Sequence, residues 1–207
     1  MPSQSSAIQV VAIPGSVRPG NYTGKALAVL ANELRQNPGI DLELIDTAGI
    51  DFPLPGMSND SPAVKRFQET VSSADGIILA TPEYHGSFSS VMKLVIENMG
   101  FPSGLSGKPV ALLGVAAGRI GAIKALEHLR SVCSHVGAIV LPGPISVAGV
   151  QQVFDEQGNC LDKGVEQEIR SLAGKLLDYI GKSRCPEVPL EEIVRQGSSV
   201  RWAPPTV

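Results

Sequence analysis

Residues 10–25 read VVAIPGSVRPGNYTGK, an apolar run that leads directly into a glycine-rich loop and then into a helical pattern. This order is typical of a strand, a phosphate-binding turn and a helix. Backbone N–H groups freed by the turn, the positive end of the helix dipole and the guanidinium of Arg18 all suit a phosphate. Ser16, Asn21 and Thr23 add side-chain donors. An ordinary turn that only caps its helix uses the same residue types, so other loops are needed to decide between the two.

Strand-length apolar runs alternate with helical patterns along the rest of the chain. The strands are expected at Ile8–Pro14, Asp41–Asp46, Gly76–Thr81, Pro109–Val115 and Ala138–Pro142. The helices are expected at Tyr22–Arg35, Pro62–Ser73, Ser87–Met99, Ile120–Val136 and Lys163–Ile180. Repeated β-α units joined by right-handed crossovers favour a parallel sheet with helices on both faces. We therefore predict an α/β fold, a flavodoxin-like three-layer sandwich whose five strands follow the order 2-1-3-4-5.

The bulk composition fits a globular protein. The chain has 207 residues, 43% of them hydrophobic and 18% charged, and its formal net charge is -3. This balance provides no positive field for nucleic acid or an anionic membrane, so neither is expected as a partner. The three cysteines, Cys133, Cys160 and Cys185, are widely spaced and favour neither a disulfide framework nor a zinc site. We expect a cytoplasmic protein.

The chain is expected to consist of one domain with two extensions. The segment 1–7 is short and polar, unlike a signal peptide, and is expected to be flexible. Residues 8–181 carry the strand and helix pattern of the flavodoxin-like domain. Residues 182–207 form a C-terminal extension outside that pattern.

The loop after the third expected strand reads TPEYHGSFSS over residues 81–90. It combines a rigid proline, a glycine and several donors in front of a helix, so a flat heterocycle such as a flavin could bind there. Tyr84 could stack on the ring or border it. An ordinary connection in which Ser87 caps the next helix explains the residues equally well. His85 is a candidate general base, although a lone loop histidine is more often a surface group.

The loop after the fourth expected strand reads GVAAGRIG over residues 114–121. It lacks the G-x-G-x-x-G spacing of a dinucleotide fingerprint, and no acidic residue follows at the end of the next strand. Its small residues instead allow the backbone to approach the edge of a bound ring. Arg119 is a candidate partner for the phosphate of a second, transient nucleotide.

Taken together, these loops resemble those of the NADPH-dependent FMN reductase family. The resemblance covers roughly residues 8–141 and includes the Gly-Lys-Pro-Val sequence that starts at Gly107. It implies FMN as cofactor, NADPH or NADH as electron donor, a flavin, quinone, chromate or azo compound as acceptor, and a homodimer or homotetramer. Two donors are exchanged relative to many members, which have serine at the position of Asn21 and asparagine at that of Thr23.

The resemblance also implies which residues bind FMN. Four residues of the first loop would hold the phosphate: Ser16, Arg18, Asn21 and Thr23. Six residues of the second loop would line the isoalloxazine: Pro82, Glu83, Tyr84, His85, Gly86 and Ser87. Four residues of the third loop would close its other side: Ala116, Ala117, Gly118 and Arg119. Glu83 carries a charge that does not suit a reduced flavin, so it is expected to hold a loop or a neighbouring subunit.

We therefore predict an enzyme in which NAD(P)H delivers a hydride to FMN, which then reduces a small acceptor. No catalytic side chain or metal site is required, because the flavin carries the chemistry. One alternative is a flavodoxin-type electron carrier, although only 4% of the residues are aromatic and the charge is nearly balanced. A second is a binding or regulatory module that holds another phosphorylated ligand without turnover.

Overall fold

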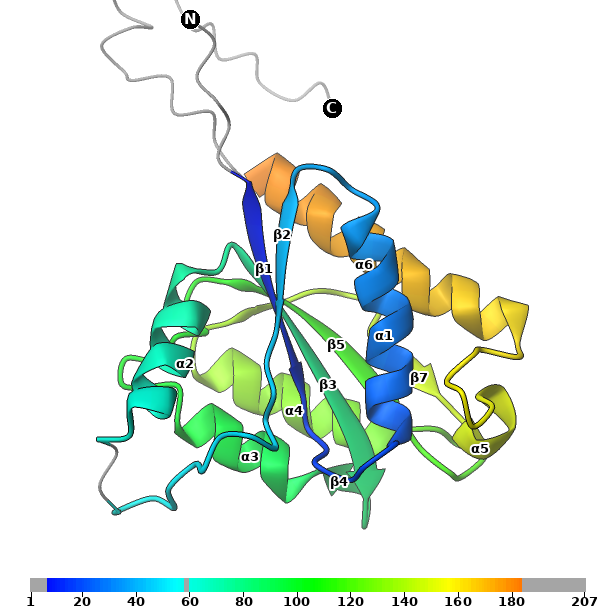
Figure 1. Ribbon diagram of the computed structural model, residues 1–207, viewed down its shortest axis with the longest axis horizontal. Coiled ribbons are helices and arrows are strands. Elements are labelled where there is room, and N and C mark those ends of the chain that lie inside the picture. Colours follow the sequence, from blue (N-terminus) through cyan, green and yellow to red (C-terminus); the bar gives the residue numbers. More distant parts are fainter. Residues whose placement is uncertain (1–6, 58–59, 184–207) are drawn as a thin grey trace, which may run out of the picture.

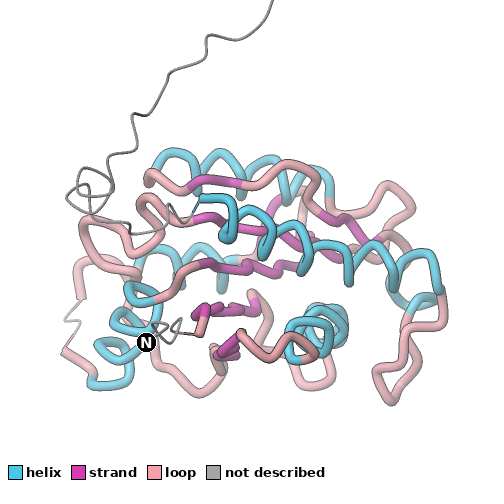
Figure 2. The backbone as a smooth tube through the Cα atoms, turned by 90° about the horizontal axis from the view of Figure 1, so that it is seen from above, coloured by secondary structure: helices cyan, strands magenta, loops and turns pink. Residues whose placement is uncertain are grey.

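The computed structural model describes residues 7–57 and 60–183 and contains a parallel sheet between two layers of helices (Figures 1 and 2). The strand order is β2-β1-β3-β5-β6. These strands are β1 (Ile8–Pro14), β2 (Ile40–Leu44), β3 (Gly76–Tyr84), β5 (Pro109–Val115) and β6 (Ile139–Val140). All four pairings between these neighbours are parallel. Because β5 and β6 are the fourth and fifth of these strands along the chain, the predicted order 2-1-3-4-5 is confirmed.

Two helices cover one face of the sheet and three cover the other. The first layer contains α1 (Tyr22–Arg35) and α6 (Lys163–Ser183), and the second contains α2 (Pro62–Ser73), α3 (Ser90–Glu97) and α4 (Ile123–His135). Leu27, Leu30 and Leu34 lie three and four residues apart on α1 and are all buried against the sheet. Each buried leucine contributes roughly 1.5–3 kcal/mol of hydrophobic stabilisation. These three leucines of α1 therefore belong to the hydrophobic core, as their spacing predicts.

The expected helix at Ser87–Met99 is wrong at its start. Ser87 and Phe88 form a short strand, β4 (Ser87–Phe88), that pairs antiparallel with the end of β3. The two residues between the strands, His85 and Gly86, have positive φ angles of 52° and 75°. Two successive positive φ angles belong to the tight turns of two-residue hairpins. Consequently α3 begins at Ser90, and the cap is Ser89, whose hydroxyl accepts from the N–H of Met92 at 3.0 Å.

The fifth strand is interrupted in its middle. After β6, a second short strand, β7 (Ile145–Val147), pairs with the later part of β5, so both pieces run along the same neighbour. Pro142 and Pro144 lack the N–H that a continuous strand would use, and Gly143 between them has φ of 70°. The chain then forms a single short helix, α5 (Val150–Val153). The sequence pattern predicts neither β7 nor α5.

The ends of the chain carry expectations that fall outside the described residues. These are the N-terminal segment 1–7, of which only Ala7 is described, and nearly all of the extension 182–207. In the ranges 7–57 and 60–183, no helix combines the length and the apolar character needed to cross a bilayer.

Candidate functional site

A pocket of about 400 Å³ lies where the loops after β1, β3 and β5 meet. The three strands are neighbours in the sheet, and Pro14 pairs with Ala80 while Pro82 pairs with Val115. Their carboxyl ends therefore reach the same rim, which is where ligands bind in open α/β sheets. The pocket is lined by three loops and by α5: Ser16, Arg18, Pro19, Gly20, Asn21, Tyr22, Thr23, Pro82, Glu83, Tyr84, Val115, Ala116, Ala117, Val150 and Gln151.

Gly15 fixes the first loop to the centre of the sheet. Its N–H donates to the carbonyl of Ala80 at 2.6 Å, and its own carbonyl accepts from the hydroxyl of Ser89 at 2.5 Å. A Cβ at this position would lie 3.0 Å from the Cβ of Met92 and 3.1 Å from the Ala80 oxygen. A side chain at this position would therefore crowd Met92 and the Ala80 carbonyl, and glycine avoids that crowding. Sequence reasoning missed Ser89, since its contact joins positions 74 residues apart.

Asn21 shapes the first loop from within. Its Oδ1 accepts from the N–H of Gly24 at 2.7 Å and caps α1, while its Nδ2 donates to the Arg18 carbonyl at 2.6 Å. Both polar atoms of the amide are thus used inside the loop. The side chain of Asn21 holds the pocket-facing backbone in place, and its expected contact with the phosphate stays a prediction.

Two hydroxyl groups of the first loop face the pocket without a protein partner. Ser16 is 8% exposed and Thr23 is 1% exposed. Within the described residues, neither hydroxyl makes a hydrogen bond. The N–H groups of Tyr22 and Thr23 open α1 and so have no intrahelical acceptor. Neither hydroxyl oxygen is fully buried, because no fully buried side-chain oxygen of the described residues lacks a partner, so both can donate to a ligand in the pocket. The helix N-terminus favours an anion as that ligand.

Arg18 links the first loop to the second. The Cζ of Arg18 lies 4.9 Å from the ring centroid of Tyr84, in a cation–π contact. The guanidinium is exposed and makes no ion pair with a carboxylate of the described residues. Both side chains line the pocket. The contact therefore joins the two loops at the pocket and places a positive charge there.

Glu83 lines the pocket and also bonds to the neighbouring helix α4. Its Oε2 accepts from the N–H of Ala125 at 3.2 Å, in the first turn of α4. The helix dipole favours a carboxylate at that end. Further along the hairpin, Ser87 Oγ lies 3.1 Å from His128 Nδ1 on the same helix. The hairpin is thus fastened to α4 at two points.

The loop after β5 lines the pocket with its first two residues only. The N–H of Ala116 donates to the Val147 carbonyl at 2.9 Å, and the N–H of Val150 donates to the Ala116 carbonyl at 3.1 Å. These bonds bring α5 to the pocket wall, with Gln151 beside Val150. Sequence reasoning missed both α5 residues, because a helix of four residues leaves no periodicity to detect.

The structure brings together nine of the fourteen residues expected at the site. The pocket includes Ser16, Arg18, Asn21, Thr23, Pro82, Glu83, Tyr84, Ala116 and Ala117. Five lie outside its lining, at the hairpin turn and on the outer part of the third loop: His85, Gly86, Ser87, Gly118 and Arg119.

Reactive cysteine chemistry has no support at this site. Burial raises the pKa of the Cys133 thiol to about 12. Burial also raises the pKa of Cys160, which lies in the segment after α5. Neither cysteine lines the pocket. Among residues 7–57 and 60–183, no group of three or more His, Cys, Asp or Glu side chains is placed to hold a metal ion.

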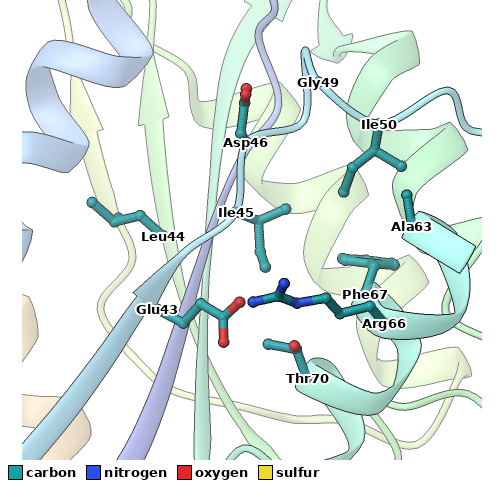
Figure 3. Close-up of a pocket in the computed structure, with 10 residues that line it drawn as sticks. All are labelled: Glu43, Leu44, Ile45, Asp46, Gly49, Ile50, Ala63, Arg66, Phe67 and Thr70. Carbon is teal, nitrogen blue, oxygen red and sulfur yellow. The ribbon is translucent and has the colours of Figure 1, made fainter.

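A second pocket lies between β2 with its following loop and α2 (Figure 3). Its volume is about 190 Å³, below the 300–1,000 Å³ of most cofactor sites. Arg66 reaches across it toward Glu43. None of the fourteen expected residues lines it. The 400 Å³ pocket, which nine of the expected residues line, is therefore the candidate cofactor site.

Residues 8–152 match the protein family described as NADPH-dependent FMN reductase. The chain belongs to this family. An NAD(P)H-dependent FMN reductase of Pseudomonas aeruginosa is 35% identical over 181 residues, covering 81% of this chain and 95% of that protein. A quinone reductase of Escherichia coli K12 is 31% identical over 187 residues, covering 84% of this chain and 95% of that protein. The resemblance found in the sequence is thus confirmed.

The fold of this family member also matches solved structures. The flavoenzyme NAD(P)H:acceptor oxidoreductase FerB of Paracoccus denitrificans superimposes with a TM-score of 0.71 at 23% identity. The match covers 85% of this chain and 98% of that one. The chain is accordingly a flavin-dependent oxidoreductase that uses FMN and NAD(P)H. The unpartnered hydroxyls at the start of α1 fit the phosphate of FMN, and the pocket volume fits its ring system.

Proposed function

We propose that the 400 Å³ pocket of the domain spanning residues 8–181 binds FMN and that the enzyme passes electrons from NAD(P)H to a small acceptor such as a quinone or a flavin. Bound FMN supplies a ring that accepts a hydride and then reduces a second substrate. The observation that carries the proposal is the pair of pocket-facing hydroxyls, Ser16 and Thr23, beside the uncapped N–H groups of α1.

In the proposal, the first loop anchors the FMN phosphate. Ser16 and Thr23 donate from their hydroxyls, and the first N–H groups of α1 donate from the backbone. The Arg18 guanidinium, which lies beside the Tyr84 ring, donates a charge-assisted hydrogen bond to the phosphate. Asn21 keeps this loop in the shape that presents the donors. The roles of these four residues are thus divided between binding and support.

The proposal places the flavin ring between the second and third loops. Tyr84 and Pro82 border it on one side, and Ala116 and Ala117 border it on the other. The two alanines add little bulk, so the backbone can approach the ring edge. An open face over the ring lets donor and acceptor bind in turn. Support for small acceptors comes from the relatives named as FMN and quinone reductases.

Assembly and location complete the proposal. We infer a homodimer or homotetramer, because Leu54, Met57 and Phe101 expose large apolar side chains next to the end of α3. The inferred compartment is the cytoplasm, where the free thiols of Cys133 and Cys160 stay reduced. The flavodoxin-type carrier is disfavoured, since the similar proteins are named as reductases.

The test replaces Thr23 with valine, which keeps the shape of the side chain and removes the hydroxyl. A hydrogen bond to a charged group contributes about 1.5–3 kcal/mol, so the dissociation constant for FMN should rise about tenfold or more. Flavin fluorescence titration measures it. Thr70→Val on α2 is the matched control, because Thr70 lines the separate pocket of Figure 3 and should leave FMN affinity unchanged. Equal affinity in Thr23→Val and the wild type would contradict the proposed anchor.

A further inference from the structure

Residues 119–123 form an exposed surface beside the proposed FMN pocket. Ile120 is 79% exposed and Ile123 is 47% exposed, an unusual display for isoleucine. Arg119 stands next to them, exposed, and makes no ion pair or hydrogen bond within the described part of the chain. We call Arg119, Ile120 and Ile123 the 119–123 shelf. It combines an apolar surface with a cation that lacks a counter-charge.

The shelf is held by a set of backbone contacts. The Gly118 carbonyl accepts from the N–H groups of Gly121 and Gly149, both at 3.2 Å. The N–H of Ala122 donates to Ser146 Oγ at 2.8 Å. Gly121 has φ of 78°, and a Cβ there would lie 2.4 Å from the same hydroxyl oxygen. The chain is thus shaped to pass tightly over Ser146 and present the two isoleucines outward.

The shelf follows, along the chain, two residues that line the proposed FMN pocket. Ala116 and Ala117 line that pocket, and Ala116 packs with Phe88, Ala122 and Ala125 at the base of the shelf. A hollow of about 290 Å³ adjoins Ile123 and is also lined by Leu126, Glu127, Arg130, Pro144 and Ser146. This volume is too small for a whole dinucleotide but is adequate for one ring system. Residues 116–123 thus run from the lining of the larger pocket to the edge of this hollow.

Two other charged groups near the shelf have different surroundings. The Cδ of Lys124 lies near the tip of the hairpin, 3.6 Å from where Gly86 would carry a Cβ. Arg130 lines the hollow and donates from Nη2 to the Leu141 carbonyl at 3.2 Å. Within the described residues, neither Arg119 nor Lys124 has a hydrogen-bond or ion-pair partner, and Arg119 is the one of the two that carries a guanidinium. A guanidinium also matches a phosphate in two-point geometry, which an ammonium does not.

We propose that the 119–123 shelf binds the adenosine end of the electron donor and that Arg119 contacts its 2′-phosphate, so the enzyme prefers NADPH to NADH. The inference rests on the proposed function of the neighbouring pocket. Ile120 and Ile123 cover the adenine, which both donors share. Arg119 contacts the phosphate, which only NADPH carries. Arg119 thus determines specificity without contacting FMN.

Arg119→Ala tests the assignment in turnover. The kcat/KM for NADPH should fall about tenfold through a higher KM, because one charge-assisted contact is lost. The kcat/KM for NADH and the FMN affinity should stay within twofold of the wild type. Arg66→Ala is the matched control, an exposed arginine on α2 at the pocket of Figure 3. Ile120→Ser should raise the KM for both donors. An equal loss with both donors in Arg119→Ala, or no loss with either, overturns the proposal.

A binding measurement separates this inference from the proposed function. Calorimetry with adenosine 2′,5′-bisphosphate and adenosine 5′-monophosphate needs no turnover. The wild type should bind the bisphosphate about tenfold more tightly, and Arg119→Ala should abolish the difference. Equal binding of both nucleotides by the wild type overturns the shelf even if NAD(P)H is oxidised. A preference that depends on Arg119 in a protein that oxidises neither donor supports the shelf and contradicts the proposed function.

Discussion

Removal of Arg18 should weaken FMN binding by an amount that the structure limits. A charge-assisted hydrogen bond to phosphate is worth about 1.5–3 kcal/mol. The guanidinium lies 4.9 Å from the Tyr84 ring centroid, and an exposed cation–π contact is worth about 0.5–1 kcal/mol. The difference leaves roughly 1–2 kcal/mol for FMN. Arg18→Ala should therefore raise the dissociation constant about 5- to 30-fold.

Fluorescence titration of FMN into the apoprotein measures this constant. Arg18→Lys keeps the charge but loses the planar guanidinium, so its dissociation constant for FMN should lie between those of the wild type and the alanine variant. Tyr84→Leu removes the competing contact, and Arg18→Ala in that background should then cost the full charge-assisted value. Unchanged FMN affinity in Arg18→Ala would refute the assignment of this arginine to the phosphate.

Two further predictions concern the frame of the site. Gly15→Ala should lower the free energy of unfolding by about 1–3 kcal/mol, because its Cβ would press on Met92 and on the Ala80 carbonyl; urea unfolding measures it, and an unchanged midpoint would contradict the close approach. Burial raises the pKa of Cys133 from 9.0 to about 12. Between pH 9.0 and about 12 the folded state keeps the thiol proton and the unfolded state releases it. The free energy of unfolding therefore falls as pH rises through this range. Urea unfolding of wild type and Cys133→Ala across this range checks the sign, since the alanine variant should decline less steeply; equal slopes would contradict it.

Local patterns predict most of the framework. The bounds of β1, α1, α2 and β5 coincide with those expected from apolar runs, helical spacing and capping residues. In these elements the side-chain pattern and the packing agree, since α1 and α2 each bury one face, β1 buries four consecutive residues and β5 buries all seven. The parallel order then follows from the β-α alternation. The turn between β1 and α1 could be predicted for the same reason, because the turn and the helix start are adjacent in the chain.

Long-range contacts explain what the sequence pattern missed. The hairpin at His85 and Gly86 is the one local exception: it depends on a positive φ at a histidine, which is uncommon outside glycine and is not predicted from the residue type alone. The hydroxyl of Ser89 reaches Gly15 across the sheet, and β7 depends on pairing with β5. The contribution of α5 to the pocket follows from that pairing. Such contacts are set by tertiary packing and leave no short-range signal.

The most direct test of the account is an anaerobic visible spectrum of the protein after reconstitution with FMN and desalting, followed by one equivalent of NADPH. The account predicts a flavin band that stays with the protein and bleaches on addition of NADPH. A band that is retained but stays oxidised would contradict the enzyme and favour an electron carrier. Loss of the band on desalting would contradict the FMN site at Ser16 and Thr23.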